Sequence, residues 1–390
     1  ALAIIAHSFR DSHARNRAWA IWGGVMGLTM VLAPLAGGVI STLLGWRWTF
    51  FVNIPICALL MLAVTRHIDE SRHEHAGTLD LPGIGLFIAG MFCLTWALIL
   101  APQHGWLSRE VVGRLCLGAL WFALFIRVER GKSSPMLNLQ LFRSLPFIGA
   151  VLAMFAYAAT AQVMTSLLPL LLQNIEGMTP LMAGAGMLPF ALAMLVFPVV
   201  ARWLGKRLHA ATLLALGLVT VSFGNLVIAT AVSHHHLLLS LAGMAILGSG
   251  GGLLNGETQK AIMATVPPQQ AGMASGISTT ARFSGILLGF ATLGAILAAS
   301  TQWHLQSAMQ QAHLALKPGF SAQVIAGDFS HALAMYDAIH QVSLGQLVIT
   351  SYADGFASML LCAAAFALFS AIVVLCSARN TRQQATQSQR

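Results

Sequence analysis

The feature that most constrains this sequence is a repeated run of about 20 apolar residues, each followed by a short polar segment. A bilayer core about 30 Å thick requires about 20 apolar residues in each helix that crosses it. Only 8% of the 390 residues are charged and 57% are hydrophobic, whereas a soluble domain carries about 25% charged residues. This composition excludes a soluble globular enzyme, a disordered chain and a nucleic-acid-binding module. The sequence therefore predicts an all-α polytopic membrane protein embedded in the lipid bilayer.

Ten stretches meet this length requirement. They are residues 18–44, 48–65, 82–101, 111–127, 147–172, 181–201, 210–231, 237–259, 283–300 and 352–376. Residues 1–9 have the character of the end of one more helix, and residue 1 is Ala rather than Met, so we expect the chain to continue a longer protein. Residues 301–350 are weakly amphipathic in places, and we expect them to lie outside the membrane as short interfacial helices.

Lysine and arginine divide unequally between the two sets of alternate loops. One set, which includes Lys260, Arg282 and the C-terminal tail, carries seventeen basic residues, whereas the other set carries four. Short cytoplasmic loops of membrane proteins collect Lys and Arg. We therefore expect the first set and the C-terminal tail to face the cytoplasm, in a protein of the plasma or inner membrane.

The sequence lacks the common motifs for cofactors and metals. It contains no G-x-x-x-x-G-K-[ST] phosphate loop, and its histidine clusters do not have the spacing of a catalytic zinc site. Its five cysteines lie in apolar stretches without C-x-x-C spacing. We expect no cofactor, no metal and no enzymatic activity, so that an ion gradient would have to supply the energy for any transport.

The first span is rich in small residues at helical spacing. The motif residues in it are Gly23, Gly24, Gly27, Ala33, Pro34, Gly37 and Gly38. Small residues four apart let two helices approach closely, and a proline bends a helix because it removes a backbone hydrogen bond. This pattern predicts either a moving interface between helices or a fixed, tightly packed seam.

One acidic residue lies well inside an apolar span. Glu257 follows a glycine-rich run and Asn255, and Lys260 lies one turn further along. Charged residues inside membrane spans are costly and suggest a function. Glu257 is therefore a candidate for charge sensing or proton coupling, and an ion pair with Lys260 at a helix end is the alternative.

Several motifs follow one another in the order found in one transporter family. The first are Trp22-Gly23, the segment from Ala33 to Gly38, Trp46-Arg47-Trp48 and Asn53-Ile54-Pro55. Later ones are Asp80-Leu81-Pro82-Gly83, Gly105-Trp106-Leu107-Ser108 and the segment from Ala271 to Gly276, with Arg282 after it. The sequence resembles the EmrB/QacA drug-resistance branch of the major facilitator superfamily, whose fifth helix carries an antiporter motif that ends Gly-Pro-x-x-Gly-Gly. Ala33 stands here in place of the first glycine of that ending.

The resemblance implies a fourteen-helix transporter of which about ten helices are present. Residues 1–65 would hold the end of helix four and helices five and six, a remnant of the first six-helix repeat. Residues 66–145 would hold cytoplasmic links and two extra central helices. Residues 146–376 would form the second six-helix repeat with a long external loop at 301–350, and residues 377–390 a cytoplasmic tail. Helices one to four, with an acidic residue implicated in proton coupling, would precede residue 1.

The resemblance also places a substrate cavity between spans 147–172 and 237–259. The candidate cavity residues are Phe155, Tyr157, Gln162, Met164 and Asn255. Aromatic, methionine and amide side chains suit a loose pocket for bulky apolar compounds. The alternative is that the polar members form hydrogen bonds between core helices.

The function that the resemblance implies is secondary active transport, namely the export of hydrophobic or cationic drugs and toxic compounds in exchange for protons. A carrier for a metabolite, a siderophore or a lipid-like solute is one alternative. A non-transporting remnant or regulatory membrane protein is another, motivated by the missing helices. In bacteria with two membranes, a periplasmic adaptor and an outer-membrane channel are further candidate partners.

Overall fold

The computed structural model of the chain describes residues 25, 28–29, 32–67, 80–131, 139–234, 236–267 and 271–387. All regular elements within these ranges are helical. Residues Leu32–Leu43 form a short apolar helix. The labelled helices that follow are α3 (Trp46–Phe51), α4 (Asn53–His67), α5 (Leu81–His104), α6 (Arg109–Arg130), η1 (Leu139–Arg143), α7 (Leu145–Tyr157), η2 (Ala158–Gln162), α8 (Met164–Asn174), α9 (Pro180–Gly186), α10 (Leu188–Leu204), α11 (Ala210–Ser233), α12 (Leu237–Leu254), α13 (Glu257–Ala264), α14 (Ala271–Gln311), α15 (Phe320–Ile325), α16 (Phe329–Leu333) and α17 (Ala338–Gln387).

Nine helical segments in these ranges are long and apolar enough to cross a membrane. They correspond to nine of the ten predicted spans, which confirms the prediction of a multi-pass helical membrane protein. The tenth, residues 18–44, is described only in part, because Gly23, Gly24 and Gly27 lie outside the described residues.

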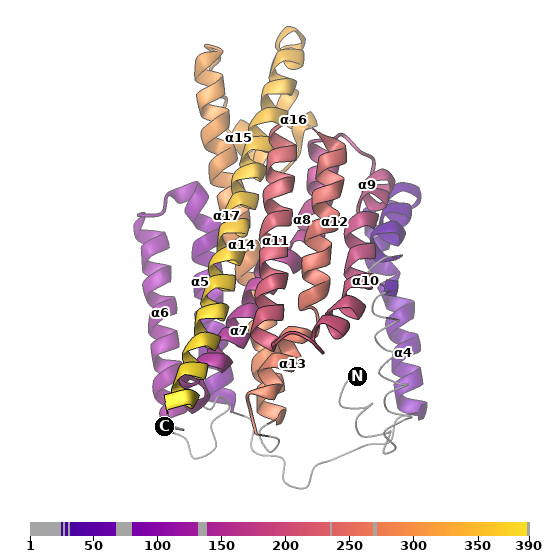
Figure 1. Cartoon of the computed structure of the whole chain (residues 1–390). Helices are drawn as coiled ribbons and strands as arrows, with labels where there is room; N and C mark the ends of the chain where they lie inside the picture. Colours follow the sequence, from indigo (N-terminus) through magenta and orange to yellow (C-terminus); the bar gives the residue numbers. More distant parts are fainter. Residues whose placement is uncertain are drawn as a thin grey trace.

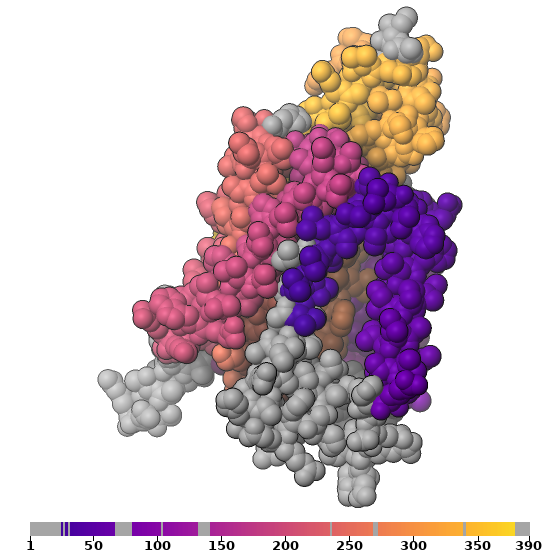
Figure 2. Space-filling model, turned by 90° about the vertical axis from the view of Figure 1, so that its right-hand side faces the viewer, coloured from indigo at the N-terminus to yellow at the C-terminus, as the bar shows by residue number. Residues whose placement is uncertain are grey.

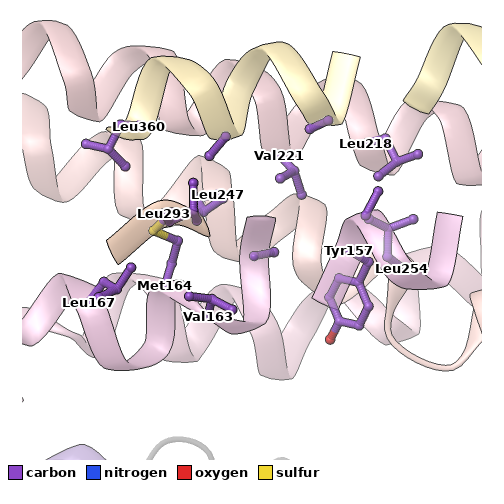
Figure 3. Close-up of a cluster of buried hydrophobic side chains, with 14 of the residues drawn as sticks. Tyr157, Val163, Met164, Leu167, Leu218, Val221, Leu247, Leu254, Leu293 and Leu360 are labelled. Atoms are coloured by element: carbon purple, nitrogen blue, oxygen red, sulfur yellow. The ribbon is translucent and has the colours of Figure 1, made fainter. Parts of the chain in front are cut away.

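The bundle is built around one apolar core. Helix α11 packs against α12 and α17, and α14 packs against α5, α7 and α17. Figure 3 shows buried leucine and valine side chains from several of these helices pointing toward one another, among them Leu218, Leu247 and Leu293. Figure 1 places α5 and α6 on one side of this bundle and α4 on the opposite side.

The starts of several helices follow from local sequence. The Asp80 side chain accepts a hydrogen bond from the Gly83 backbone N–H at 2.8 Å, and Pro82 lies in the first turn of α5. Ser108 and Thr179 cap α6 and α9 in the same way. These side chains satisfy backbone donors that a helix start leaves open, so the predicted start near Asp80 and Pro82 is confirmed.

Two helices continue far beyond their predicted ends. Helix α14 runs for 41 residues and α17 for 50 residues, and their outer parts project above the bundle in Figure 1. Residues 301–350 are therefore not a loop, since only residues 312–337 lie between these two helices. Residues 377–387, expected in a tail, continue α17.

The segment between α14 and α17 folds onto the projecting helix ends. We call residues 302–348 the cap. Its buried side chains are Leu305, Met309, Phe320, Val324, Ala332, Leu344 and Val348. This core is separate from that of the bundle, so the weakly amphipathic pattern reflects helices that pack against one another.

Candidate functional site

The helix Leu32–Leu43 meets α9 with almost no space between the two backbones. A Cβ atom placed on Gly38 would lie 2.8 Å from the Pro180 carbonyl oxygen, and one on Gly184 would lie 2.5 Å from the Pro34 carbonyl oxygen. Side chains larger than hydrogen cannot occupy either position without a shift of the backbone. A close contact at a small residue is thus present at Gly38, and its partner is α9.

The other described motif residues have different surroundings from Gly38. A Cβ atom on Gly37 would meet no described atom within 4 Å, so Gly37 is not part of the close contact. Ala33 and Pro34 line a cavity next to it. Among the described motif residues, Gly38 and the Pro34 backbone thus form the close contact, and Gly37 does not.

This cavity, of about 520 Å³, lies between the helix Leu32–Leu43 and the second half of the chain. We call it the central cavity. Its described lining residues are Thr29, Ala33, Pro34, Gln162, Thr165, Ser166, Pro169, Met187, Phe190, Ala191, Met194, Ile286 and Phe290. In Figure 2 the indigo segment lies directly against the magenta segment that contains α9 and α10. The lining combines apolar and methionine side chains with a few hydroxyl groups and one amide.

A second cavity, of about 610 Å³, lies between α5, α6, α7 and α14. Phe155 lines this lateral cavity, together with Phe87, Phe125 and Met273. The structure therefore does not bring Phe155 to the central cavity. It shares the lateral cavity with residues of α5, α6 and α14.

Two further predicted cavity residues are buried in protein. Tyr157 and Met164 are both completely buried and belong to the core of the bundle. Figure 3 shows Met164 beside Leu167 and Leu293, whereas the Tyr157 hydroxyl group points away from the labelled aliphatic side chains. Met164 thus packs the core, and Gln162 is the one predicted cavity residue that lines the central cavity.

Arg282 contacts three of the predicted cavity residues. The sequence analysis had placed Arg282 in a cytoplasmic loop. It lies eleven residues inside α14. Its Nε donates a hydrogen bond to Gln162 Oε1 at 2.9 Å, and its Nη2 donates to Asn255 Oδ1 at 3.3 Å. Its guanidinium carbon lies 5.9 Å from the centre of the Tyr157 ring. The loop assignment is wrong because residues 271–281 are uncharged and form the first turns of α14.

A wide helical turn positions Gln162. Residues Ala158–Gln162 form a π-helix between α7 and α8; such turns shift the side chains that follow them and are frequent at functional sites. Asn225 of α11 supports the turn, since its Nδ2 donates a hydrogen bond to the Thr160 carbonyl oxygen at 3.2 Å. Asn225 is completely buried, and its position in an otherwise apolar span was the signal that could have identified it.

Glu257 lies just after the break between α12 and α13, within the apolar segment Leu237–Ala264. Gly256 has a φ angle of 87 degrees, a positive value that suits glycine, and α13 begins directly after it. The Glu257 carboxylate pairs with Lys260 Nζ at 3.2 Å. This is the ion pair that the sequence offered as the alternative, and the role of Glu257 in charge sensing stays a prediction.

Several lining residues were missed by the sequence analysis. Phe190 and Met194 of α10, and Ile286 and Phe290 of α14, line the central cavity. Their four-residue spacing on each helix places each pair on one face, but apolar residues at that spacing are equally expected in a core. The described residues contain no group of three or more His, Cys, Asp or Glu side chains arranged to hold a metal ion.

Known proteins of similar sequence are drug exporters and resistance proteins. The chain is 34% identical over 312 residues to the multidrug resistance protein Stp of Mycobacterium tuberculosis, a match that covers 80% of this chain and 58% of Stp. It is 32% identical over 300 residues to the multidrug efflux pump LfrA of Mycolicibacterium smegmatis, covering 76% of this chain and 59% of LfrA. A tetracenomycin C resistance and export protein of Streptomyces glaucescens is 30% identical over 284 residues, or 73% of this chain and 53% of that protein. The chain thus spans less than two thirds of the length of these relatives.

The fold agrees with a solved transporter structure. A bacterial homologue of the human lysosomal transporter Spinster, in an inward-facing and occupied conformation, superimposes with a TM-score of 0.56 at 15% identity, covering 97% of this chain and 72% of that one. The family profile of the Major Facilitator Superfamily matches residues 1–290. With its helical bundle and central cavity, this chain belongs to the Major Facilitator Superfamily.

Proposed function

We propose that this protein is a secondary active transporter that exports hydrophobic or cationic drugs and toxic compounds in exchange for protons. The observation that carries the proposal is the central cavity, which is lined both by the helix Leu32–Leu43 and by α8, α10 and α14. A cavity at the junction of two parts of a bundle is where alternating access places a solute. The names of the relatives support drugs as the substrate class.

The chemistry of the lining supports the same substrate class. Met187, Met194, Phe190 and Phe290 supply adaptable and aromatic apolar contacts, which accept solutes of different shapes. Thr165, Ser166 and Gln162 supply a few hydrogen-bonding groups. The close contact at Gly38 and Gly184 would let the two parts move against each other on smooth helix surfaces.

The proposal includes an orientation and a division of the chain. The cytoplasmic face would hold α13, the C-terminal end of α17 and most of the basic loops, in accord with the positive-inside rule. The remnant of the first repeat would be residues 1–65, and the links with the two extra helices would be residues 66–145. The second repeat would be residues 146–376, and the tail residues 377–390. In a host with two membranes, a periplasmic adaptor and an outer-membrane channel would complete the export path.

The test is proton-driven transport by the protein in vesicles of its native membranes. Ethidium, a hydrophobic cation, should be transported when a pH gradient is imposed, and a protonophore should abolish this transport. Phe290→Ala, which removes a ring from the central cavity, should reduce the transport rate several-fold. Phe369→Ala, at a 58% exposed position of α17, is the matched control and should leave the rate unchanged.

Two other results would favour the alternatives. Transport of a metabolite, siderophore or lipid-like solute, with no transport of ethidium, would indicate a carrier of that class. No gradient-dependent movement of any solute in the panel would indicate a non-transporting remnant or regulatory protein.

A further inference from the structure

Arg282 carries a positive charge inside the bundle, and its hydrogen-bond partners are neutral. The Gln162 and Asn255 side-chain oxygens accept from Nε and Nη2. Arg282 lies about 17 Å along α14 from the first residue of the helix, at 1.5 Å per residue. Among the described residues, no carboxylate forms an ion pair with it. A guanidinium group has five N–H donors, so its charge and part of its donor capacity have no anionic partner there.

Tyr157 provides a second, independent observation. Its side chain is completely buried, and within the described part of the chain no acceptor receives a hydrogen bond from its hydroxyl group. The ring lies beside the Arg282 guanidinium group at 5.9 Å, and its hydroxyl points away from the apolar core (Figure 3). A buried hydroxyl group without an acceptor is costly. An acceptor bound beside Arg282 would satisfy it.

The Arg282 site adjoins the central cavity. Gln162, which accepts a hydrogen bond from Arg282, is itself a lining residue, and so is Ile286, one helical turn after Arg282. A ligand group that enters from the cavity therefore meets Gln162 first and Arg282 next to it.

From these observations we infer that Arg282, Tyr157, Gln162 and Asn255 form a binding site for a carboxylate group. Planar guanidinium groups bind carboxylates through paired hydrogen bonds, and a tyrosine hydroxyl group can donate a further one. The carboxylate can come from a transported solute or from an acidic side chain of this protein. This inference rests on the proposed function, because Gln162, one of the four residues, lines the cavity through which solutes would pass.

The charge of Arg282 also bears on cationic solutes. An unbalanced guanidinium group in a low-dielectric cavity would repel them, since charges interact strongly where water is excluded. A carboxylate on Arg282 would remove this repulsion. The site therefore accounts for how a cavity with a resident cation could accept cationic compounds.

The first arm of the test compares two solutes of similar size and shape, one with a carboxylate group and one with a neutral amide group. Calorimetry on the protein from native membranes, reconstituted in lipid nanodiscs, would measure the binding of 1-naphthoate and of 1-naphthamide. If the carboxylate comes from a solute, naphthoate should bind at least about tenfold more tightly, which corresponds to about 1.4 kcal/mol. Arg282→Gln should abolish this preference, Arg282→Lys should keep part of it and Tyr157→Phe should reduce it. Arg202→Gln, at an exposed position near the end of α10, makes the same charge change and should not alter it.

The second arm detects a carboxylate of the protein itself. If an acidic side chain occupies the site, wild type should show no preference for naphthoate. Its thermal midpoint should instead fall on acidification from pH 7 to pH 4 by more than that of Arg282→Gln, because protonation removes the ion pair. Arg202→Gln should behave as wild type does. Arg282→Lys and Tyr157→Phe provide the same comparisons if Arg282→Gln does not accumulate.

The inference is overturned if neither the preference for naphthoate nor the acid sensitivity depends on Arg282. Neither measurement requires a gradient. Carboxylate binding without ethidium transport would therefore contradict the export proposal alone, and ethidium transport without either effect would contradict the carboxylate site alone.

Discussion

At the scale of single residues, two adjacent glycines of the first helix differ in what surrounds them. Gly38 faces the backbone of α9, where a Cβ atom would lie 2.8 Å from the Pro180 carbonyl oxygen and 3.0 Å from the Leu181 Cα atom. Gly37 faces no described atom within 4 Å. The distinction follows from the three-dimensional packing, because both residues have the same type and nearly the same position in the motif.

We therefore expect Gly38→Ala and Gly37→Ala to differ. A methyl group forced into a packed contact costs about 1–3 kcal/mol, so Gly38→Ala should lower the ethidium transport rate about tenfold or reduce the amount of folded protein. Gly37→Ala should leave both within about twofold of wild type. Transport rate per folded molecule and the thermal midpoint measure the two effects. Equal behaviour of the variants would contradict the placement of the seam at Gly38.

Three residues of the proposed Arg282 site were among the candidates that the sequence singled out, but their arrangement was not predicted. Tyr157, Gln162 and Asn255 stood out because polar side chains are uncommon in apolar spans. Their shared partner did not, since Arg282 follows eleven residues whose small and hydroxyl side chains suit a loop or a helix equally well. Phe155 and Met164 were assigned to the central cavity by their residue types, and only packing decides that Phe155 faces the lateral cavity and Met164 the core.

At the scale of helices, length and hydropathy located the spans but not all of their ends. The start of α5 was predictable because Asp80 and Pro82 form a local signal. The outer ends of α14 and α17 were not, because these helices continue outside the apolar stretch by packing against α15 and α16. Tertiary contacts stabilise those turns, and hydropathy does not record such contacts.

Within the cap, α16 begins with a charged hydrogen-bonding residue. Asp328 accepts hydrogen bonds from the His331 backbone N–H at 3.2 Å and from the Ser330 hydroxyl group at 2.9 Å. Its carboxylate also lies 2.8 Å from His331 Nδ1. The hydrogen bond from the His331 side chain is the largest cause that lowers the pKa of Asp328 below its ordinary value of 3.8, followed by that from the backbone.

This lowered pKa predicts an acid-sensitive cap. Folding favours the carboxylate form of Asp328. Its contribution to the stability of the cap is therefore present above the ordinary pKa, and it is lost as the pH falls through the lowered pKa. At pH 7, Asp328→Ala should therefore increase hydrogen exchange in residues 320–336, after correction for the intrinsic effect of pH. Well below pH 3.8, wild type and variant should exchange at similar rates. A difference that persists unchanged at low pH would show that the charge of Asp328 is not involved.

At the scale of the whole molecule, the two ends of the bundle differ in composition. Helix α13, with the exposed Lys260, lies at the end opposite the cap (Figure 1). Lys317 lies in the cap and interacts with Tyr336. Without Arg282, sixteen basic residues remain in the loops assigned to the cytoplasm against four in the others, so the predicted orientation does not depend on the misplaced arginine.

Cysteine labelling in intact cells tests this orientation. In a variant without the five native cysteines, Lys317→Cys should react with a membrane-impermeant maleimide added outside. Lys260→Cys should react only after the membrane is permeabilised. The reverse pattern would require the opposite orientation, and a normal amount of ethidium transport in both variants would control for misfolding.

The continuity of α14 has a mechanical consequence. A helix of 41 residues is about 60 Å long, and it carries the cap at one end and the Arg282 site in its inner part. If α14 tilts by about 10 degrees around its inner end, its far end moves by about 10 Å, as its length requires. Such a tilt of α14 would displace the cap far enough for a distance probe attached to the cap to measure it.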